Sequence, residues 1–231
     1  MKAVKHKIAT DGKPLEVCKT APLRFLNVCS AVNKKRIPVL MADNNMDYVL
    51  GSNTFRDKIR EIEFVKIDID LVPCSAWDVS DDKKGSIWAW TENTDSGKTV
   101  KIGSENGIYA NPDCEGLFQN YMNVTRIEFH NLFNTSQVTS MKGMFSNCFE
   151  LKELEVSGFD TGQVTDMSKM FFSCRALSKL DVSGFRTRYD TVINHMFSGC
   201  ENLTELDISH FDARKIAYAP DMFEGCRKLK L

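Results

Sequence analysis

Cysteine and histidine are the residues of this chain that could bind a metal ion or form disulfides. The sequence contains eight cysteines and four histidines. Four of the cysteines recur at an interval of 26 residues, at Cys148, Cys174, Cys200 and Cys226. A zinc site requires closely spaced ligands such as Cys-x-x-Cys, and neither residue type has that spacing. Because equivalent repeat positions are typical of core packing rather than pairing, we predict no metal site, no cofactor and no disulfide framework.

Tryptophans and aspartates in the N-terminal half could carry other chemistry. Trp77, Trp88 and Trp90 could stack on a sugar or a base, and the aspartates between residues 68 and 82 could form a carboxylate pair or a cation site. Tryptophans in short strands are more often core residues, and no Asp-x-Asp-x-Asp-Gly loop follows the aspartates. The sequence also lacks a phosphate-binding loop, a dinucleotide motif and a Gly-x-Ser-x-Gly nucleophile motif. We therefore predict a protein that is not an enzyme, with a tryptophan-based binder or enzyme as an alternative.

A repeated pattern determines the predicted architecture of the C-terminal half. A Leu-x-x-Leu-x-Val/Ile core and a Met-Phe pair recur with the period of the cysteines. A period in the twenties with such a core is typical of leucine-rich repeats. Residues 151–156 predict a short strand, and apolar residues spaced by three or four over 164–174 predict a short helix. The sequence thus predicts an α/β fold, a solenoid of about four 26-residue strand-turn-helix repeats over residues 117–231.

The N-terminal half shows no such repeat. Residues 1–45 are predicted to form an irregular arm, and residues 46–116 a small α/β capping region. Within that region, residues 54–62 have helical spacing, while residues 64–71, 86–90 and 99–102 predict strands. The polar segment 92–97 predicts a turn between the last two strands.

Strand alternation predicts which side chains of the repeats point outward. The outward positions form three columns. The second, called the acidic column, has a carboxylate in every repeat, at Glu128, Glu155, Asp181 and Asp207. Either this column is a solvated repeat position balanced by Arg126 and Lys179, or it contacts a cationic partner surface. The candidate partner-binding residues are Arg126, Glu128, His130, Glu153, Glu155, Lys179, Asp181, Glu205 and Asp207.

Charge and hydropathy narrow the classes of partner and the compartment. The net charge of −1 does not favour direct nucleic-acid binding. The acidic column instead favours a protein partner with a basic surface. No stretch approaches the roughly 20 apolar residues of a membrane helix. The basic N-terminus is not followed by the roughly 7–15 apolar residues of a signal peptide, which predicts a cytoplasmic protein. A secreted or surface location is the alternative if the sequence is truncated.

These motifs in combination resemble the BspA-like leucine-rich-repeat family. The resemblance covers the chain from about Tyr48 to its C-terminus. It rests on Ala76-Trp77-Asp78-Val79-Ser80, Gly85-Ser86-Ile87-Trp88-Ala89-Trp90, Ile102-Gly103, Tyr109-Ala110-Asn111-Pro112, Leu117-Phe118 and the repeat motif itself. It implies a bacterial, mycoplasmal or mobile-element origin and a non-enzymatic binding role.

The functional hypothesis is a protein–protein interaction module that uses the strand face and adjoining loops. One specific form is a phage- or element-encoded inhibitor that occupies the basic groove of a host protein inside the cell. The alternative, implied by the family resemblance, is a secreted or surface adhesin.

Overall fold

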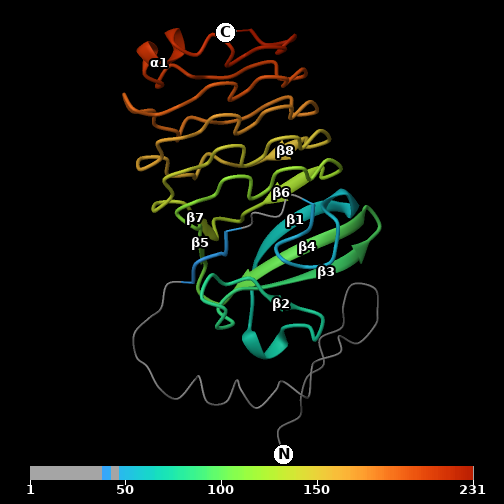
Figure 1. The fold of residues 1–231 in the computed structure, drawn as a ribbon. Coiled ribbons are helices and arrows are strands. Elements are labelled where there is room, and N and C mark those ends of the chain that lie inside the picture. Colours follow the sequence, from blue (N-terminus) through green and yellow to red (C-terminus); the bar gives the residue numbers. More distant parts are fainter. Residues whose placement is uncertain (1–37, 43–46, 231) are drawn as a thin grey trace, which may run out of the picture.

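The computed structural model describes residues 38–42 and 47–230 (Figure 1). The predicted N-terminal arm, residues 1–45, therefore lies outside the described residues except for 38–42. Among the residues that are described, no helix is long and apolar enough to cross a membrane.

A six-stranded mixed sheet connects the two halves of the chain. In spatial order its strands are β2 (Trp77–Asp78), β3 (Trp88–Thr94), β4 (Gly97–Ser104), β1 (Ile59–Lys66), β6 (Arg126–Glu128) and β8 (Glu153–Leu154). β3 and β4 form an antiparallel hairpin, whereas β1 runs parallel to both β4 and β6. A second sheet pairs β5 (Ile108–Tyr109) with β7 (Phe133–Asn134). Because β1 pairs directly with β6, side chains of the N-terminal half lie beside those of the first repeat.

The N-terminal half contains the predicted hairpin but not the predicted helix. β3 and β4 turn within residues 92–97, as the sequence indicates. Residues 54–62 form only the 3₁₀ helix η1 (Arg56–Lys58) before β1 begins. The pairing of β1 with β4 shifts register between Ile59 and Glu61, and this bulge lets Ile59 and Ile62 both face the core. Two buried side chains three residues apart therefore occur in a strand here, although that spacing is typical of a helix. The predicted strand over 64–71 is also too long, because β1 ends at Lys66 and η2 (Ile69–Leu71) is a 3₁₀ helix.

Consecutive turns, rather than helices, form the repeat segments with three- and four-residue apolar spacing. Lys169 and Ser173 have φ angles of 56° and 59°, in the left-handed region that a right-handed helix excludes. The N–H groups of Lys169, Phe171 and Ser173 donate at 2.8–2.9 Å to carbonyls of the next repeat, in Asn194, Met196 and Ser198. These donors are therefore unavailable for i→i−4 helical bonds.

The predicted α/β fold class with strand-turn-helix repeats is consequently wrong. Among the described residues, strands and β-bridges account for 25% and helical conformations for 5%. The single α-helix within the described ranges is α1 (Ala213–Ala217), in the last part of the chain. A mixed sheet followed by stacked turns replaces the predicted architecture.

The repeats stack on one another in parallel register (Figure 1). One column of bridges links Asp113, Ser140, Asp166 and Val192. A ladder of aromatic rings runs through the core, from Phe118 through Phe145, Phe171 and Phe197 to Phe223. Neighbouring ring centroids lie 5.5–5.7 Å apart, with interplanar angles of 4–13°. Each such pair adds about 0.5–1.5 kcal/mol beyond the burial of apolar area, so the ladder ties every repeat to the next.

The repeat cysteines form a second ladder in this core. Cys148, Cys174 and Cys200 are buried, and Cys226 is half-buried. Each thiol donates to a phenylalanine carbonyl of the preceding repeat; for Cys174 the Sγ–O distance to Phe145 is 3.2 Å. Burial raises the pKa of Cys148 to about 12, which keeps this thiol protonated and able to donate. The predicted packing role of these cysteines is thus confirmed.

Gly158 and Gly184 occupy equivalent positions in neighbouring repeats but differ in the space around them. A Cβ at position 184 would lie 2.3 Å from the carbonyl oxygen of Ser157, whereas the nearest atom to a Cβ at position 158 is 3.9 Å away. We expect Gly184→Ala to lower the free energy of unfolding by about 1–3 kcal/mol, because the backbone at Ser157 must move to make room for the methyl group. Gly158→Ala is the matched control, with an expected change below about 0.5 kcal/mol. Urea denaturation measures both, and equal stability of the two variants would contradict this packing.

Candidate functional site

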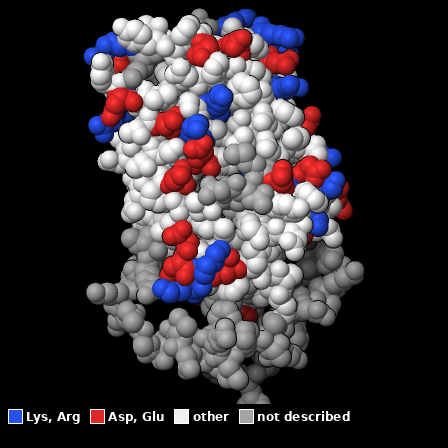
Figure 2. All heavy atoms as spheres, in the orientation of Figure 1, with Lys and Arg blue, Asp and Glu red and all other residues white. Residues whose placement is uncertain are grey.

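Charged side chains of alternating sign form one column on the outer face of the strands. Arg126 of β6 lies in register between Glu61 of β1 and Glu153 of β8. In the later repeats, Glu205 lies in register between Lys179 and Lys230. Adjacent strands are about 4.8 Å apart, so opposite charges in this column partly offset one another. Figure 2 shows such small mixed groups of acidic and basic side chains over the repeats.

The acidic column borders a shallow groove across the later repeats. This groove has a volume of about 440 Å³ and an apolar floor that includes Leu180 and Leu206. Its charged lining consists of four carboxylates and one ammonium group, from Glu155, Asp181, Glu205, Asp207 and Lys179. All five side chains are exposed. The structure thus brings together five of the nine residues that the sequence analysis selects.

Three of these carboxylates also stabilise the turns that follow the strands. Glu155 accepts a hydrogen bond from the backbone N–H of Ser157 at 2.9 Å. Asp181 accepts a hydrogen bond from the backbone N–H of Ser183 at 2.9 Å, and Asp207 accepts the same bond from Ser209 at 2.9 Å. Hydrogen bonds from Ser183, through its side chain and its backbone, lower the pKa of Asp181. Those from the backbone and side chain of Ser209 lower the pKa of Asp207. Asp181 and Asp207 therefore have a structural role in the turns, and their lowered pKa values keep both carboxylates ionised at neutral pH.

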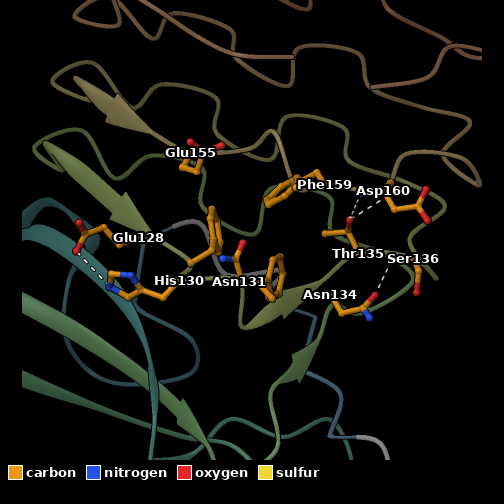
Figure 3. A pocket seen from close by; sticks show the side chains of 12 residues that line it. Glu128, His130, Asn131, Asn134, Thr135, Ser136, Glu155, Phe159 and Asp160 are labelled. Atoms are coloured by element: carbon orange, nitrogen blue, oxygen red, sulfur yellow. Dashed lines mark hydrogen bonds and ion pairs between the residues drawn. The ribbon is translucent and has the colours of Figure 1, made fainter. Parts of the chain in front are cut away.

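A larger cavity of about 600 Å³ lies beside the first repeat. Figure 3 shows Glu128 and His130 on one side and a group of polar residues, Asn134, Thr135, Ser136 and Asp160, on the other. The first repeat is one residue longer than those that follow it. Its turn contains His130 and Asn131, with φ angles of 47° and 57°. We attribute the cavity to this longer turn, which cannot follow the path of the shorter turn in the next repeat.

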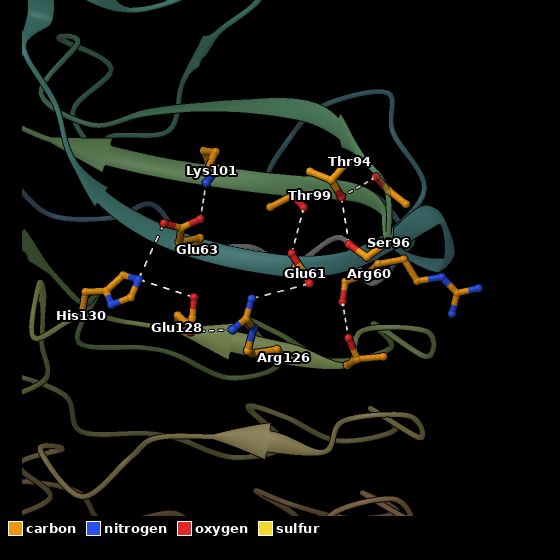
Figure 4. A network of polar contacts seen from close by, with 12 residues as sticks. Arg60, Glu61, Glu63, Thr94, Ser96, Thr99, Lys101, Arg126, Glu128 and His130 are labelled. Atoms are coloured by element: carbon orange, nitrogen blue, oxygen red, sulfur yellow. Dashed lines mark hydrogen bonds and ion pairs between the residues drawn. The ribbon is translucent and has the colours of Figure 1, made fainter. Parts of the chain in front are cut away.

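A chain of ion pairs runs across β4, β1 and β6 next to this cavity (Figure 4). Glu63 pairs with Lys101 and lies 3.6 Å from the Nε2 atom of His130. Glu128 lies 3.5 Å from the same nitrogen and 3.0 Å from Arg126. The side chains of these five residues are 20–50% exposed, so each pair contributes at most about 1 kcal/mol to stability. The network mainly fixes the orientation of its members.

The other four candidate partner-binding residues, Arg126, Glu128, His130 and Glu153, lie outside the groove. Arg126, Glu128 and His130 belong to the ion-pair network, and Glu155 lines both the cavity and the groove. Glu153 lines neither and lies in register with Arg126.

Sequence reasoning did not anticipate the residues that β1 and β4 add to this face, namely Glu61, Glu63, Thr99 and Lys101. The tripeptide Ile62-Glu63-Phe64 recurs as Ile127-Glu128-Phe129. This repetition was the available signal that β1 presents the same face as β6.

The three tryptophans do not form an exposed platform. Trp90 is buried, and Trp77 and Trp88 are half-buried. Their indole N–H groups donate within the protein at 2.8–3.0 Å, to Glu92, Leu50 and Gly85 respectively. This placement lends no support to a tryptophan-based sugar or base binder.

Comparisons with known proteins identify a family for the chain. A family model described as "Mycoplasma protein of unknown function, DUF285" matches residues 112–231, which is 120 of the 231 residues. No curated protein matches, and no solved structure matches. The expected resemblance is thus supported at the level of the mycoplasmal repeat proteins and does not extend to a specific leucine-rich-repeat family. The chain belongs to the DUF285 family of Mycoplasma proteins.

Proposed function

We propose that this chain is a non-enzymatic binding protein whose strand face and adjoining loops contact a protein partner with a basic surface. The observation that carries this proposal is the groove lined by Glu155, Lys179, Asp181, Glu205 and Asp207. Four exposed carboxylates against one ammonium group give the groove an excess negative charge. Such a surface attracts a basic partner over several ångströms and raises the rate of specific association.

The structural role of Asp181 and Asp207 is compatible with this function. The serine contacts lower the pKa values of both carboxylates, so both keep their charge at neutral pH. The turns also hold the two carboxylates in place, which reduces the side-chain entropy lost when a partner binds.

A more specific form of the proposal is inhibition of a nucleic-acid-handling protein. Such proteins carry basic grooves that bind phosphates. A column of carboxylates at strand spacing would compete with the phosphate backbone for such a groove. The resemblance to BspA-like proteins supports a binding role of some kind without distinguishing this form from an adhesin.

The proposal is tested with a variant that removes charge and preserves the turns. In the variant Glu155→Gln, Asp181→Asn, Asp207→Asn, each amide oxygen can still accept the serine N–H bond, whereas serine substitutions would lose it. The tagged wild-type protein and this variant are used for affinity capture from a mycoplasma lysate. We expect a stoichiometric protein that is retained by the wild type at low salt, released as salt increases, and reduced at least about tenfold with the variant.

A matched variant controls for the change in net charge. Asp95→Asn, Glu105→Gln, Glu150→Gln removes the same three negative charges from exposed positions outside the groove. This control is expected to capture the partner as the wild type does. Equal capture by the wild type and the groove variant would exclude the strand face as the binding surface, and equal loss with both variants would indicate a nonspecific effect of charge.

A further inference from the structure

Three potential metal ligands converge beside the cavity from two distant parts of the chain. Glu63 comes from β1, Glu128 from β6, and His130 from the turn that follows β6 (Figure 4). Their ligand atoms all lie within 4.8 Å of one another. Within the described residues this is the single cluster of three His, Cys, Asp or Glu side chains with such geometry.

The two separations that involve His130 match those of a tetrahedral metal centre. Tetrahedral ligands at 2.0–2.2 Å from a zinc ion are separated from each other by roughly 3.4 Å. The Nε2 atom of His130 lies 3.6 Å from the Oε1 atom of Glu63 and 3.5 Å from the Oε2 atom of Glu128. We propose that Glu63, Glu128 and His130 bind a divalent transition-metal ion such as Zn²⁺.

Two neighbouring cations orient the carboxylates for this role. Lys101 pairs with the Oε2 atom of Glu63, and Arg126 pairs with the Oε1 atom of Glu128 at 3.0 Å. In each carboxylate the oxygen that faces His130 is the one that these cations do not hold. Hydrogen-bonded outer partners of this kind fix ligands in metal sites. Here they limit each glutamate to one ligating oxygen.

The donor set indicates the class of metal. One imidazole and two carboxylates suit Zn²⁺, Co²⁺ and Ni²⁺, whereas Mg²⁺ and Ca²⁺ prefer sites made of oxygen ligands alone. Three protein ligands leave a fourth position for water or a small ligand. Glu128 and His130 also line the cavity of about 600 Å³, so such a ligand has space beside the metal.

Calorimetric titration with ZnCl₂ tests this site on the full-length protein under reducing conditions. We expect one saturable equivalent of Zn²⁺ for the wild type and an affinity at least about 100-fold lower for His130→Asn and for Glu63→Gln. Asparagine suits position 130 because it tolerates the φ angle of 47°. Exposed His210, whose ring nitrogen contacts the carbonyl of Val182 at 2.7 Å, is the matched control. His210→Asn should bind Zn²⁺ as the wild type does.

Absorption spectra of the Co²⁺ complex separate this site from binding by the eight cysteines. Nitrogen and oxygen ligands give d–d bands without the thiolate-to-metal charge-transfer band that cysteine ligation produces. We expect d–d bands alone, and their loss in His130→Asn. The proposal is overturned by an absence of one-equivalent binding in the wild type, by a thiolate band at the first equivalent, or by unchanged affinity in both ligand variants.

Discussion

Cys174→Asp is expected to unfold the stacked repeats. The Cys174 side chain is fully buried between the preceding and following repeats, and its thiol donates to the carbonyl of Phe145. An aspartate there would bury a carboxylate next to a carbonyl oxygen, with no donor to replace the thiol. Burying an uncompensated charge costs about 3–5 kcal/mol or more, which approaches the entire 5–15 kcal/mol that stabilises a typical domain. Circular dichroism and urea denaturation would measure the loss.

Ser178→Asp is the matched control for this substitution. Ser178 is exposed and lies four residues further along the same repeat. The control adds the same charge and should change the free energy of unfolding by less than about 0.5 kcal/mol. A Cys174→Asp variant as stable as Ser178→Asp would show that the cysteine ladder does not lie in the core.

Arg56→Ala is expected to separate the N-terminal sheet from the first repeat. The side chain of Arg56 is only 1% exposed. It donates to the carbonyl of Tyr48 at 2.9 Å, to that of Gly116 at 3.2 Å and to that of Gln119. Its guanidinium carbon also lies 4.9 Å from the ring centroid of Tyr121. Alanine would remove these three hydrogen bonds and the contact with the Tyr121 ring and would leave a cavity in their place, so we expect a loss of about 3–5 kcal/mol in the free energy of unfolding.

Arg60→Ala distinguishes this effect from the simple loss of an arginine. Arg60 is exposed, and its guanidinium donates to the carbonyl of Asn123 at 3.3 Å, also across the same two regions of the chain. The expected loss is below about 1 kcal/mol, because water can replace this donor. Thermal denaturation of both variants would test the difference. Similar melting temperatures would contradict a specific role for the buried guanidinium.

The hydrophobic pattern of the repeats identified the core correctly but the secondary structure incorrectly. Val164, Met167, Met170, Phe171 and Cys174 are all buried, as their spacing indicates. Consecutive turns of three or four residues place side chains on one face at the same intervals as a helix does. The period therefore could not distinguish the two structures. Gly143, Asn147 and Gly199, which adopt left-handed φ angles in these segments, were the available indication of turns.

For the candidate site too, the sequence indicated local features but not the pairing of distant strands. Alternation within each strand was sufficient to select the outward residues of the groove, such as Glu155, Asp181 and Asp207. It could not show that β1 pairs with β6, because that pairing joins residues about 65 positions apart. Glu63 therefore meets Glu128 and His130 only in the folded protein.

The sequence by itself determined the repeat period, the buried face of each repeat and the charged columns, because these follow from side-chain spacing along one segment. Only the tertiary structure decided that the backbone N–H groups bond to the next repeat instead of within a helix. It also decided that β1 joins the repeats to form the polar network and the cluster of metal ligands. Both outcomes depend on contacts between distant segments, and no local spacing encodes which distant partner a strand or a turn will meet.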